Sequence, residues 1–314
     1  MQNAKGLVSA GLLLGLAATP AAAFEVRVGV IEGLSGPPAI VDFGESYLQG
    51  IELALQDHEA ADRAAEIELI VYDDEANPQR AVTLARRLLQ DDRVSAMMGT
   101  VNSGNVMAFA PLNQQAGVPL VAGPSIATGI TAEFIDEDPS FVFRCSMVEK
   151  YQIDAMLDWG VENFERIGLL HSTTGYGSFA ADEIKKGMQE RGAELVAVEA
   201  AAPGVNDLTS QMIRLRDAEA GLVLNFHESF ELPYRALPRI DYDPVFAGNW
   251  GLSSAKVLDI VGEEAIEGTV MGQALDMNDP DAQAFDERMR AEYGEAYRWP
   301  VVAALGYDAG TIMF

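Results

Sequence analysis

Short apolar segments alternate with longer amphipathic segments along most of this 314-residue chain. The apolar segments have the composition of β-strands, whereas the amphipathic segments repeat apolar residues at helical spacing. In the first half of the chain, strands are predicted at residues 25–31, 67–72, 94–98 and 118–122. Regular alternation of strands and helices predicts an α/β fold, in which helices cover both faces of a parallel sheet.

The helix between the second and third predicted strands has the clearest start signal. Asn77 is a favourable N-cap residue, and Pro78 suits the first helical position. Apolar residues follow at helical spacing, namely Val82, Ala85, Leu88 and Leu89. The sequence therefore predicts a helix that begins at Pro78 and packs one face on the sheet.

The second half of the chain repeats this alternation and predicts a second lobe. Its strands are expected at residues 166–171, 194–199, 221–225 and 244–247. The chain should cross to the second lobe near residues 141–145 and return near 269–273. We therefore expect a discontinuous first lobe of residues 24–142 and 276–314, and a second lobe of residues 143–275.

Polar loops follow the predicted strands of the first half, at residues 33–44, 99–105 and 123–128. In open α/β sheets, ligands bind outside the carboxyl ends of the strands. Asn102 and Ser103 lie just after the third strand and near the start of a helix, where hydroxyl and backbone N–H groups can hold an anion. These loops predict a binding site, and no catalytic machinery is visible in them.

Several short motifs occur along the chain in a fixed order. They are SGP at 35–37, YDD at 72–74, VxAMMG at 94–99, VPLVxxPS at 118–125, FVFR at 141–144 and HxxxxYG at 171–177. With this order and spacing, the chain resembles the periplasmic branched-chain amino-acid-binding proteins, the type I solute receptors of ABC importers. The resemblance covers most of the chain. It implies two hinged α/β lobes around a small-molecule ligand, an ABC permease as partner, and a monomer. Family members usually continue past the last predicted helix, so we expect the C-terminal end of the fold to be missing.

The resemblance also implies ligand contacts in the first lobe. Ser103 matches a serine that contacts the ligand carboxylate, although a role as an ordinary N-cap stays open. A second hydroxyl is expected after the fourth strand, where an ungapped match places Ile126, so a small register change must bring in Ser125 or Thr128. Simple turn chemistry is the alternative for Ser125. Phe43 matches a family aromatic residue after a two-residue insertion is allowed.

In the second lobe, Tyr176 matches a tyrosine that faces the cleft, with core packing as the alternative. His227 matches a position where relatives carry an aromatic ligand contact. With Glu228 it forms either a polar recognition element or a plain loop pair.

Trp250 is the main departure from the family pattern. It occupies the position where amino-acid receptors carry an acid that pairs with the ligand ammonium. An indole cannot balance a buried positive charge, and Glu228 or Asp276 would have to replace the acid. We therefore expect a carboxylate or amide ligand with an apolar or planar body.

Residues 1–23 have the features of a cleavable secretory signal: Lys5, an apolar stretch at 6–18 and small residues at 21–23. No cysteine lies near the expected cleavage site, so we expect a periplasmic protein without a lipid anchor or membrane insertion. The only cysteine, Cys145, cannot form an internal disulfide.

The formal net charge is −27, which disfavours nucleic acids and anionic membranes as partners. A strongly acidic surface is consistent with growth in high salt, and equally with ordinary solubility.

Two other classes of function were compared with the receptor. A ligand-sensing module of a regulatory or chemosensory system would use the same fold, but no signalling domain is visible. An enzyme is disfavoured because the sequence lacks GxSxG, HExxH and Walker motifs. Its three histidines and one cysteine are scattered, so we expect no catalytic residues, metal or cofactor.

Overall fold

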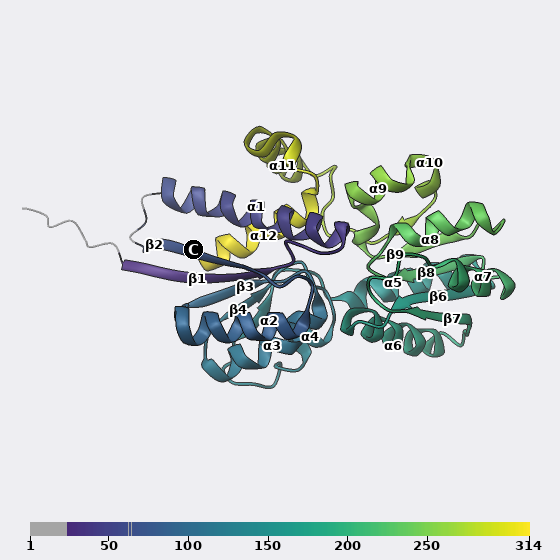
Figure 1. Ribbon diagram of the computed structural model, residues 1–314, viewed down its shortest axis with the longest axis horizontal. Coiled ribbons are helices and arrows are strands. Elements are labelled where there is room, and N and C mark those ends of the chain that lie inside the picture. The colour runs from purple at the N-terminus through teal and green to yellow at the C-terminus, as the bar shows by residue number, and fades with distance from the viewer. Residues whose placement is uncertain (1–23, 62, 64) are drawn as a thin grey trace, which may run out of the picture.

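The computed structural model describes residues 24–61, 63 and 65–314, and these residues form two lobes that lie side by side (Figure 1). The predicted signal segment, residues 1–23, lies outside the described residues. Each lobe is built around a five-stranded sheet in which every strand pair is parallel. No helix in the described part of the chain has both the length and the apolar content needed to cross a membrane.

The first sheet has the strand order β2-β1-β3-β4-β5. Its strands are β1 (Phe24–Glu32), β2 (Ala65–Asp73), β3 (Ala96–Gly99), β4 (Leu120–Ala122) and β5 (Val142–Arg144). Its helices are α1 (Pro38–Ala60), α2 (Pro78–Arg87), α3 (Ser103–Ala116) and α4 (Gly129–Ala132), and the π-helical turn η1 (Leu88–Asp92) extends α2. Helices α2 and α3 cover one face of the sheet and α1 covers the other (Figure 1).

The second sheet has the order β10-β9-β8-β6-β7. Its strands are β6 (Ile167–Ser172), β7 (Leu195–Ala201), β8 (Leu222–Phe226), β9 (Val245–Gly248) and β10 (Val270–Met271). The helices of this lobe are α5 (Glu149–Asn163), α6 (Gly175–Glu190), α7 (Thr209–Asp217), α8 (Glu231–Ala236), α9 (Ala255–Val261) and α10 (Glu263–Ile266), with short 3₁₀ turns η2 (Leu237–Arg239) and η3 (Trp250–Ser253). Strands β6 and β8 are buried along their whole length, which explains their continuous apolar sequence.

The last helices return to the first lobe. They are α11 (Pro280–Tyr293), the turn η4 (Gly294–Ala296) and α12 (Pro300–Met313). Helix α12 packs along α1 through two facing glycines, Gly50 and Gly306. A Cβ atom on Gly306 would collide with the carbonyl oxygen of Tyr47, so glycine is needed for the two helix backbones to approach this closely.

The predicted fold class is confirmed, because both sheets are parallel and carry helices on both faces. Helix α2 begins at Pro78, and the side chain of Asn77 accepts a hydrogen bond of 3.0 Å from the Arg80 N–H. Two details differ from the expectation. The first sheet runs two residues past the predicted boundary at 142, because Arg144 in β5 still pairs with Ala122 in β4. The segment predicted as the return crossing starts as a strand, because β10 pairs with β9.

Arg144 links the segment that crosses to the second lobe with the loop after β4 in the first lobe. Its guanidinium donates hydrogen bonds to the carbonyl oxygens of Ile126 (3.1 Å) and Ala127 (2.8 Å) and to the Thr131 hydroxyl (3.1 Å). The loop after β4 and the start of the crossing segment are therefore held as one unit.

Candidate functional site

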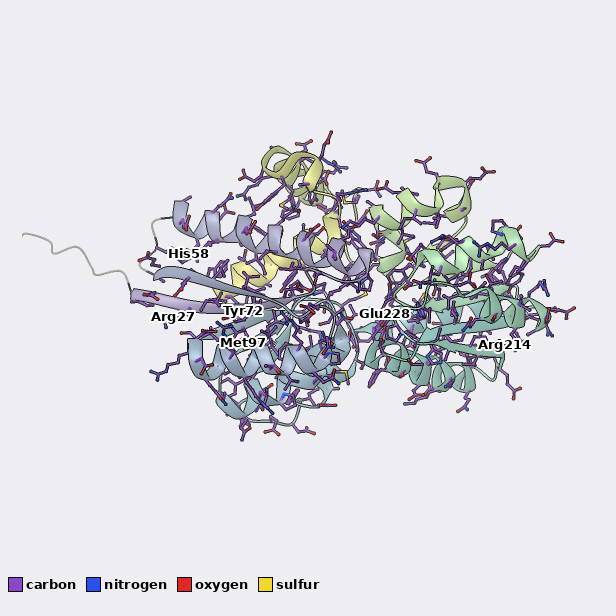
Figure 2. The ribbon with its side chains drawn as sticks, viewed as in Figure 1. Arg27, His58, Tyr72, Met97, Arg214 and Glu228 are labelled. Atoms are coloured by element: carbon purple, nitrogen blue, oxygen red, sulfur yellow. The ribbon has the colours of Figure 1, made fainter. Side chains whose placement is uncertain are left out.

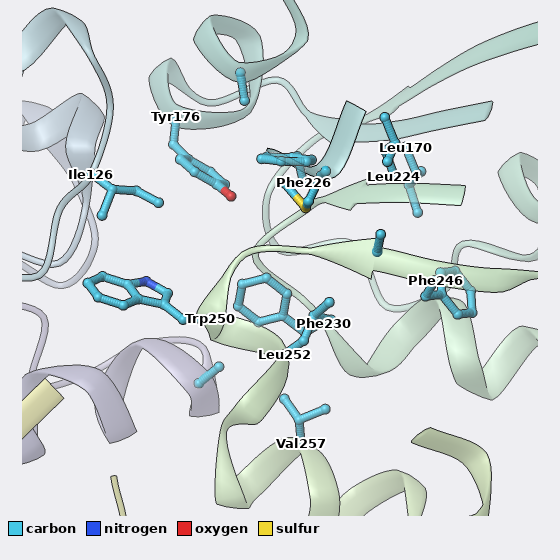
Figure 3. Close-up of a cluster of buried hydrophobic side chains, with 14 of the residues drawn as sticks. Ile126, Leu170, Tyr176, Leu224, Phe226, Phe230, Phe246, Trp250, Leu252 and Val257 are labelled. Carbon is cyan, nitrogen blue, oxygen red and sulfur yellow. The ribbon is translucent and has the colours of Figure 1, made fainter. Parts of the chain in front are cut away.

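A small cavity of about 40 Å³ lies between the two lobes, and we call it the inner cavity. Its lining comes from both lobes: Ile40, Phe43, Val101, Asn102, Ser103, Pro124 and Ile126 from the first, and Tyr176, Glu228, Phe230, Asn249 and Trp250 from the second. Figure 3 shows Ile126, Tyr176 and Trp250 converging from three different elements. This volume is well below the roughly 300–1,000 Å³ of most ligand pockets, so the inner cavity is small for a ligand in this arrangement of the lobes.

A second cavity of about 350 Å³ adjoins the first, and we call it the outer cavity. The two share four lining residues, Ile40, Asn102, Tyr176 and Glu228. The outer cavity runs past the N-terminal ends of α3 and α6. Together the two cavities lie at the carboxyl ends of strands in both sheets, where α/β folds bind ligands.

The first lobe presents hydrogen-bond donors to the inner cavity. The Ser103 hydroxyl oxygen accepts a bond of 3.3 Å from the Ala127 N–H, which leaves the hydroxyl hydrogen free to be donated. The Nδ2 atom of Asn102 is buried and has no hydrogen-bond partner among the described residues. Both residues can therefore donate to an oxygen atom of a ligand.

The loop that carries these donors is braced by two buried carboxyl groups, Glu32 and Asp74. Glu32 accepts hydrogen bonds from the Gly33 N–H (3.0 Å) and the Val101 N–H (2.7 Å). The Thr100 hydroxyl lies 3.2 Å from Glu32 Oε1 and 3.0 Å from Asp74 Oδ2, and its single hydrogen serves one of them at a time. Burial, followed by the charge of Asp74, raises the pKa of Glu32 to about 8, and burial also raises the pKa of Asp74. Glu32 is therefore protonated at neutral pH.

Among the residues predicted in the first lobe, the structure brings Ser103, Asn102 and Phe43 to the inner cavity. Phe43 also packs on Trp299, with ring centroids 4.0 Å apart.

The predicted register change after β4 is not seen. Ile126 lines the cavity, whereas Ser125 and Thr128 do not. Ser125 is buried, and its hydroxyl has no partner among the described residues. Thr128 donates a hydrogen bond of 2.9 Å to Glu183 on α6, so it joins the two lobes at the edge of the cleft. The residue from the ungapped match, an isoleucine, provides an apolar wall at this point.

In the second lobe, Tyr176 and Trp250 line the inner cavity. Tyr176 lies in the first turn of α6, and its hydroxyl is hydrogen-bonded to the side chain of Asn249. Burial raises the pKa of Tyr176 well above its ordinary value, which keeps the phenol neutral. Trp250 begins the turn η3, which Asn249 caps by accepting a bond of 2.7 Å from the Gly251 N–H.

His227 and Asp276 line neither cavity, whereas Glu228 lines both. The His227 Nδ1 atom accepts a hydrogen bond of 3.1 Å from the Ser229 N–H, and burial lowers its pKa. Asp276 is exposed, and hydrogen bonds from Asn278 lower its pKa. Of the two acids considered as replacements at the Trp250 position, Glu228 is the one at the cavity.

Two lining residues, Asn249 and Phe230, were missed from the sequence. Asn249 adjoins Trp250 directly after β9, and its position at a strand end is the signal that could have found it. Phe230 is not part of a recognisable sequence motif. It lies beside Trp250 because of the turn that leads into α8 (Figure 3).

Polar contacts between the lobes flank the site on the side opposite Thr128. Asp42 on α1 accepts a hydrogen bond of 2.9 Å from the Ser254 hydroxyl, and the Lys256 ammonium lies 3.7 Å from the same carboxylate. The Trp299 indole N–H donates to the Ser253 hydroxyl at 3.2 Å. The lobes are therefore joined on both sides of the inner cavity.

This chain is similar to known proteins in both sequence and fold. The sequence profile of the family described as "Periplasmic binding protein" matches residues 25–314. A Leu/Ile/Val-binding protein homolog of Brucella melitensis is 25% identical over 312 residues, covering 96% of this chain and 83% of the relative.

Two solved structures share the fold. The substrate-binding protein LivJ of a branched-chain amino-acid transporter of Streptococcus pneumoniae, solved with isoleucine, gives a TM-score of 0.77 at 20% identity, with 91% of this chain and 82% of that one covered. An ABC-transporter solute-binding protein of Rhodopseudomonas palustris, solved with 3,4-dihydroxybenzoic acid, gives 0.78 at 23% identity, with 92% and 79% covered.

The buried Glu32 predicts a specific dependence of stability on pH. Because its pKa is about 8 in the folded chain and near 4.5 ordinarily, unfolding between these pH values releases a proton. Protonated Glu32 therefore stabilises the folded chain most fully below about pH 4.5. This contribution to the free energy of unfolding is lost as the pH rises toward about 8, by at most about 1.4 kcal/mol per pH unit. Glu32→Gln keeps an oxygen acceptor and removes the titration. Urea unfolding should show the variant gaining stability relative to the wild type as the pH rises from about 5 to about 8; a pH-independent difference would contradict this assignment.

Proposed function

The chain belongs to the family of periplasmic binding proteins, and we propose that it is the solute receptor of an ABC importer. In this role it captures a small polar molecule in the periplasm and presents it to a permease in the inner membrane. The observation that carries the proposal is the cavity between the two lobes, lined by donors from one lobe and by aromatic and polar side chains from the other.

A receptor of this kind works by closing its lobes around the ligand. A ligand that touches both lobes binds the closed form better than the open form, and this difference in affinity is what drives closure. The shared lining of the inner cavity supports this mechanism, because any molecule in it must contact both lobes.

The lining also supports a class of ligand. Phe43, Phe230 and Trp250 give flat apolar surfaces, while Asn102 and Ser103 offer donors to an oxygen atom. A carboxylate or amide with an apolar or planar body suits these walls. One structural relative was solved with isoleucine and another with 3,4-dihydroxybenzoic acid, so compounds of both kinds belong in a ligand screen.

The direct test is ligand-linked stabilisation. A compound that binds only the folded protein should add about 2.7 kcal/mol to its free energy of unfolding at roughly 100 times its dissociation constant. A thermal-shift panel of carboxylates, amides, amines and amino acids should therefore contain compounds that raise the melting temperature. A panel with no such compound would count against a receptor function.

Ser103→Ala should weaken binding of the tightest panel ligand. Loss of a hydrogen bond to a charged group costs roughly 1.5–3 kcal/mol, whereas loss of an N-cap costs about 1 kcal/mol of folding stability. Titration calorimetry and melting of the unliganded protein separate the two effects. The matched control is Ser125→Ala, which truncates a buried serine outside the cavity and should leave the affinity unchanged. Equal affinities for both variants would remove Ser103 from the site.

Trp250 should report ligand binding and influence ligand class. Its indole can stack on a planar ligand but cannot serve as the counter-charge of an ammonium group. We expect leucine, isoleucine and valine to bind more weakly than the best planar amide in competition titrations. The ligand should change tryptophan emission, and Trp250→Phe should remove most of that change. Trp159→Phe is the control, because Trp159 packs against Phe164 and lines neither cavity.

A further inference from the structure

Glu228 has an unusual position in the binding site. It lies just after β8, on the side of the second lobe that faces the first (Figure 2). Among the described residues that line the inner and outer cavities, Glu228 is the one charged side chain, and it borders both. A ligand that spans the two cavities must therefore pass this carboxylate.

The two oxygens of the Glu228 carboxylate have different environments. Oε1 accepts a hydrogen bond from the Thr174 hydroxyl, which also caps α6 by accepting from the Gly177 N–H at 3.2 Å. Oε2 is buried and has no partner among the described residues. One oxygen is thus fixed in place by the protein while the other remains available as an acceptor.

A carboxylate in this position discriminates between ligand groups. An anionic group beside it is repelled, since the lining offers no lysine or arginine to compensate within the described residues. An N–H group satisfies Oε2, and a cationic one also gains from the aromatic faces of Tyr176 and Trp250.

The opposite wall has the complementary chemistry. Asn102 and Ser103 of the first lobe present donors, so they require an acceptor atom on the ligand. The second lobe presents Glu228, which requires a donor. A ligand with an acceptor at one end and an N–H group at the other satisfies both walls and bridges the lobes.

Building on the proposed receptor function, we propose that Glu228 is a specificity-determining residue that selects ligands bearing an amide N–H or a protonated nitrogen.

Three flat compounds of nearly equal size test this proposal: benzamidine, a cation; benzamide, a neutral N–H donor; and benzoate, an anion without an N–H group. Calorimetric titration of the protein should give a dissociation constant for benzamidine or benzamide at least about tenfold lower than for benzoate. Benzoate binding as tightly as both, or failure of both nitrogen compounds to bind, would overturn the proposal.

Variants of Glu228 separate charge from hydrogen bonding. Glu228→Ala should weaken the nitrogen compounds by at least about tenfold. Glu228→Gln removes the charge but keeps an acceptor oxygen, so it should weaken benzamidine far more than benzamide. Asp276→Asn is the matched control, because it neutralises an exposed acid of the same region that lines neither cavity.

The outcomes separate this proposal from the receptor function. Unchanged affinity in Glu228→Ala would overturn the role of Glu228 while leaving the receptor intact. A thermal-shift panel without any binder would overturn both. Melting of the unliganded variants identifies a folding defect. If Glu228→Ala fails to fold, the comparison of benzamidine with benzamide in Glu228→Gln decides whether Glu228 selects the ligand.

Discussion

The close approach of α3 and α6 is the constraint on which the binding site depends. A Cβ atom on Gly175 would lie only 2.9 Å from the Cα atom of Gly104, so the two helix ends meet through backbone atoms. Only residues without side chains allow the lobes to come this near. The contact lies at the wall of the outer cavity and brings the loop that carries Ser103 opposite the segments that carry Tyr176 and Glu228.

Around this contact, polar interactions join the lobes beside a buried apolar cluster that includes residues of both lobes. The bonds Thr128–Glu183 and Asp42–Ser254 lie on opposite sides of the cavity. Each exchanges a bond to water for a bond within the protein, so its net contribution is on the order of 1 kcal/mol. Hydrogen bonds of this strength add little to the cost of separating the lobes, and a ligand that bonds to both lobes favours the closed form. The hydrogen bonds of Glu32 and Asp74 differ from these contacts, because they are buried within the first lobe. They hold the loop of Asn102 in place independently of the contacts between the lobes.

The fold could be predicted from the sequence because each element carries its own local signal. Apolar strands, the Asn77 cap and the polar loops at strand ends are all readable within a few residues, and parallel sheets follow from their alternation. The site was only partly predictable. Family resemblance located Ser103, Phe43, Tyr176 and Trp250 at the cavity, but the same comparison could not decide the register after β4, where Ile126 takes the position expected for a hydroxyl. That choice depends on how the crossing at Arg144 holds the loop, which is a long-range contact with no local sequence pattern.

Electrostatics connects the site to the whole molecule. A chain with a formal net charge of −27 attracts cations and repels anions over distances comparable to the Debye length, about 8 Å at physiological ionic strength. Both cavities have the same preference at short range, because the one charged side chain among the described lining residues, Glu228, is an acid. The Thr174 hydroxyl at the N-terminal end of α6 donates a hydrogen bond to one oxygen of this carboxylate and holds it in place. The other oxygen makes the second lobe receptive to N–H groups. An anionic group finds its favourable contacts only with the neutral donors of the first lobe, which fixes the direction in which a ligand with two different ends must lie.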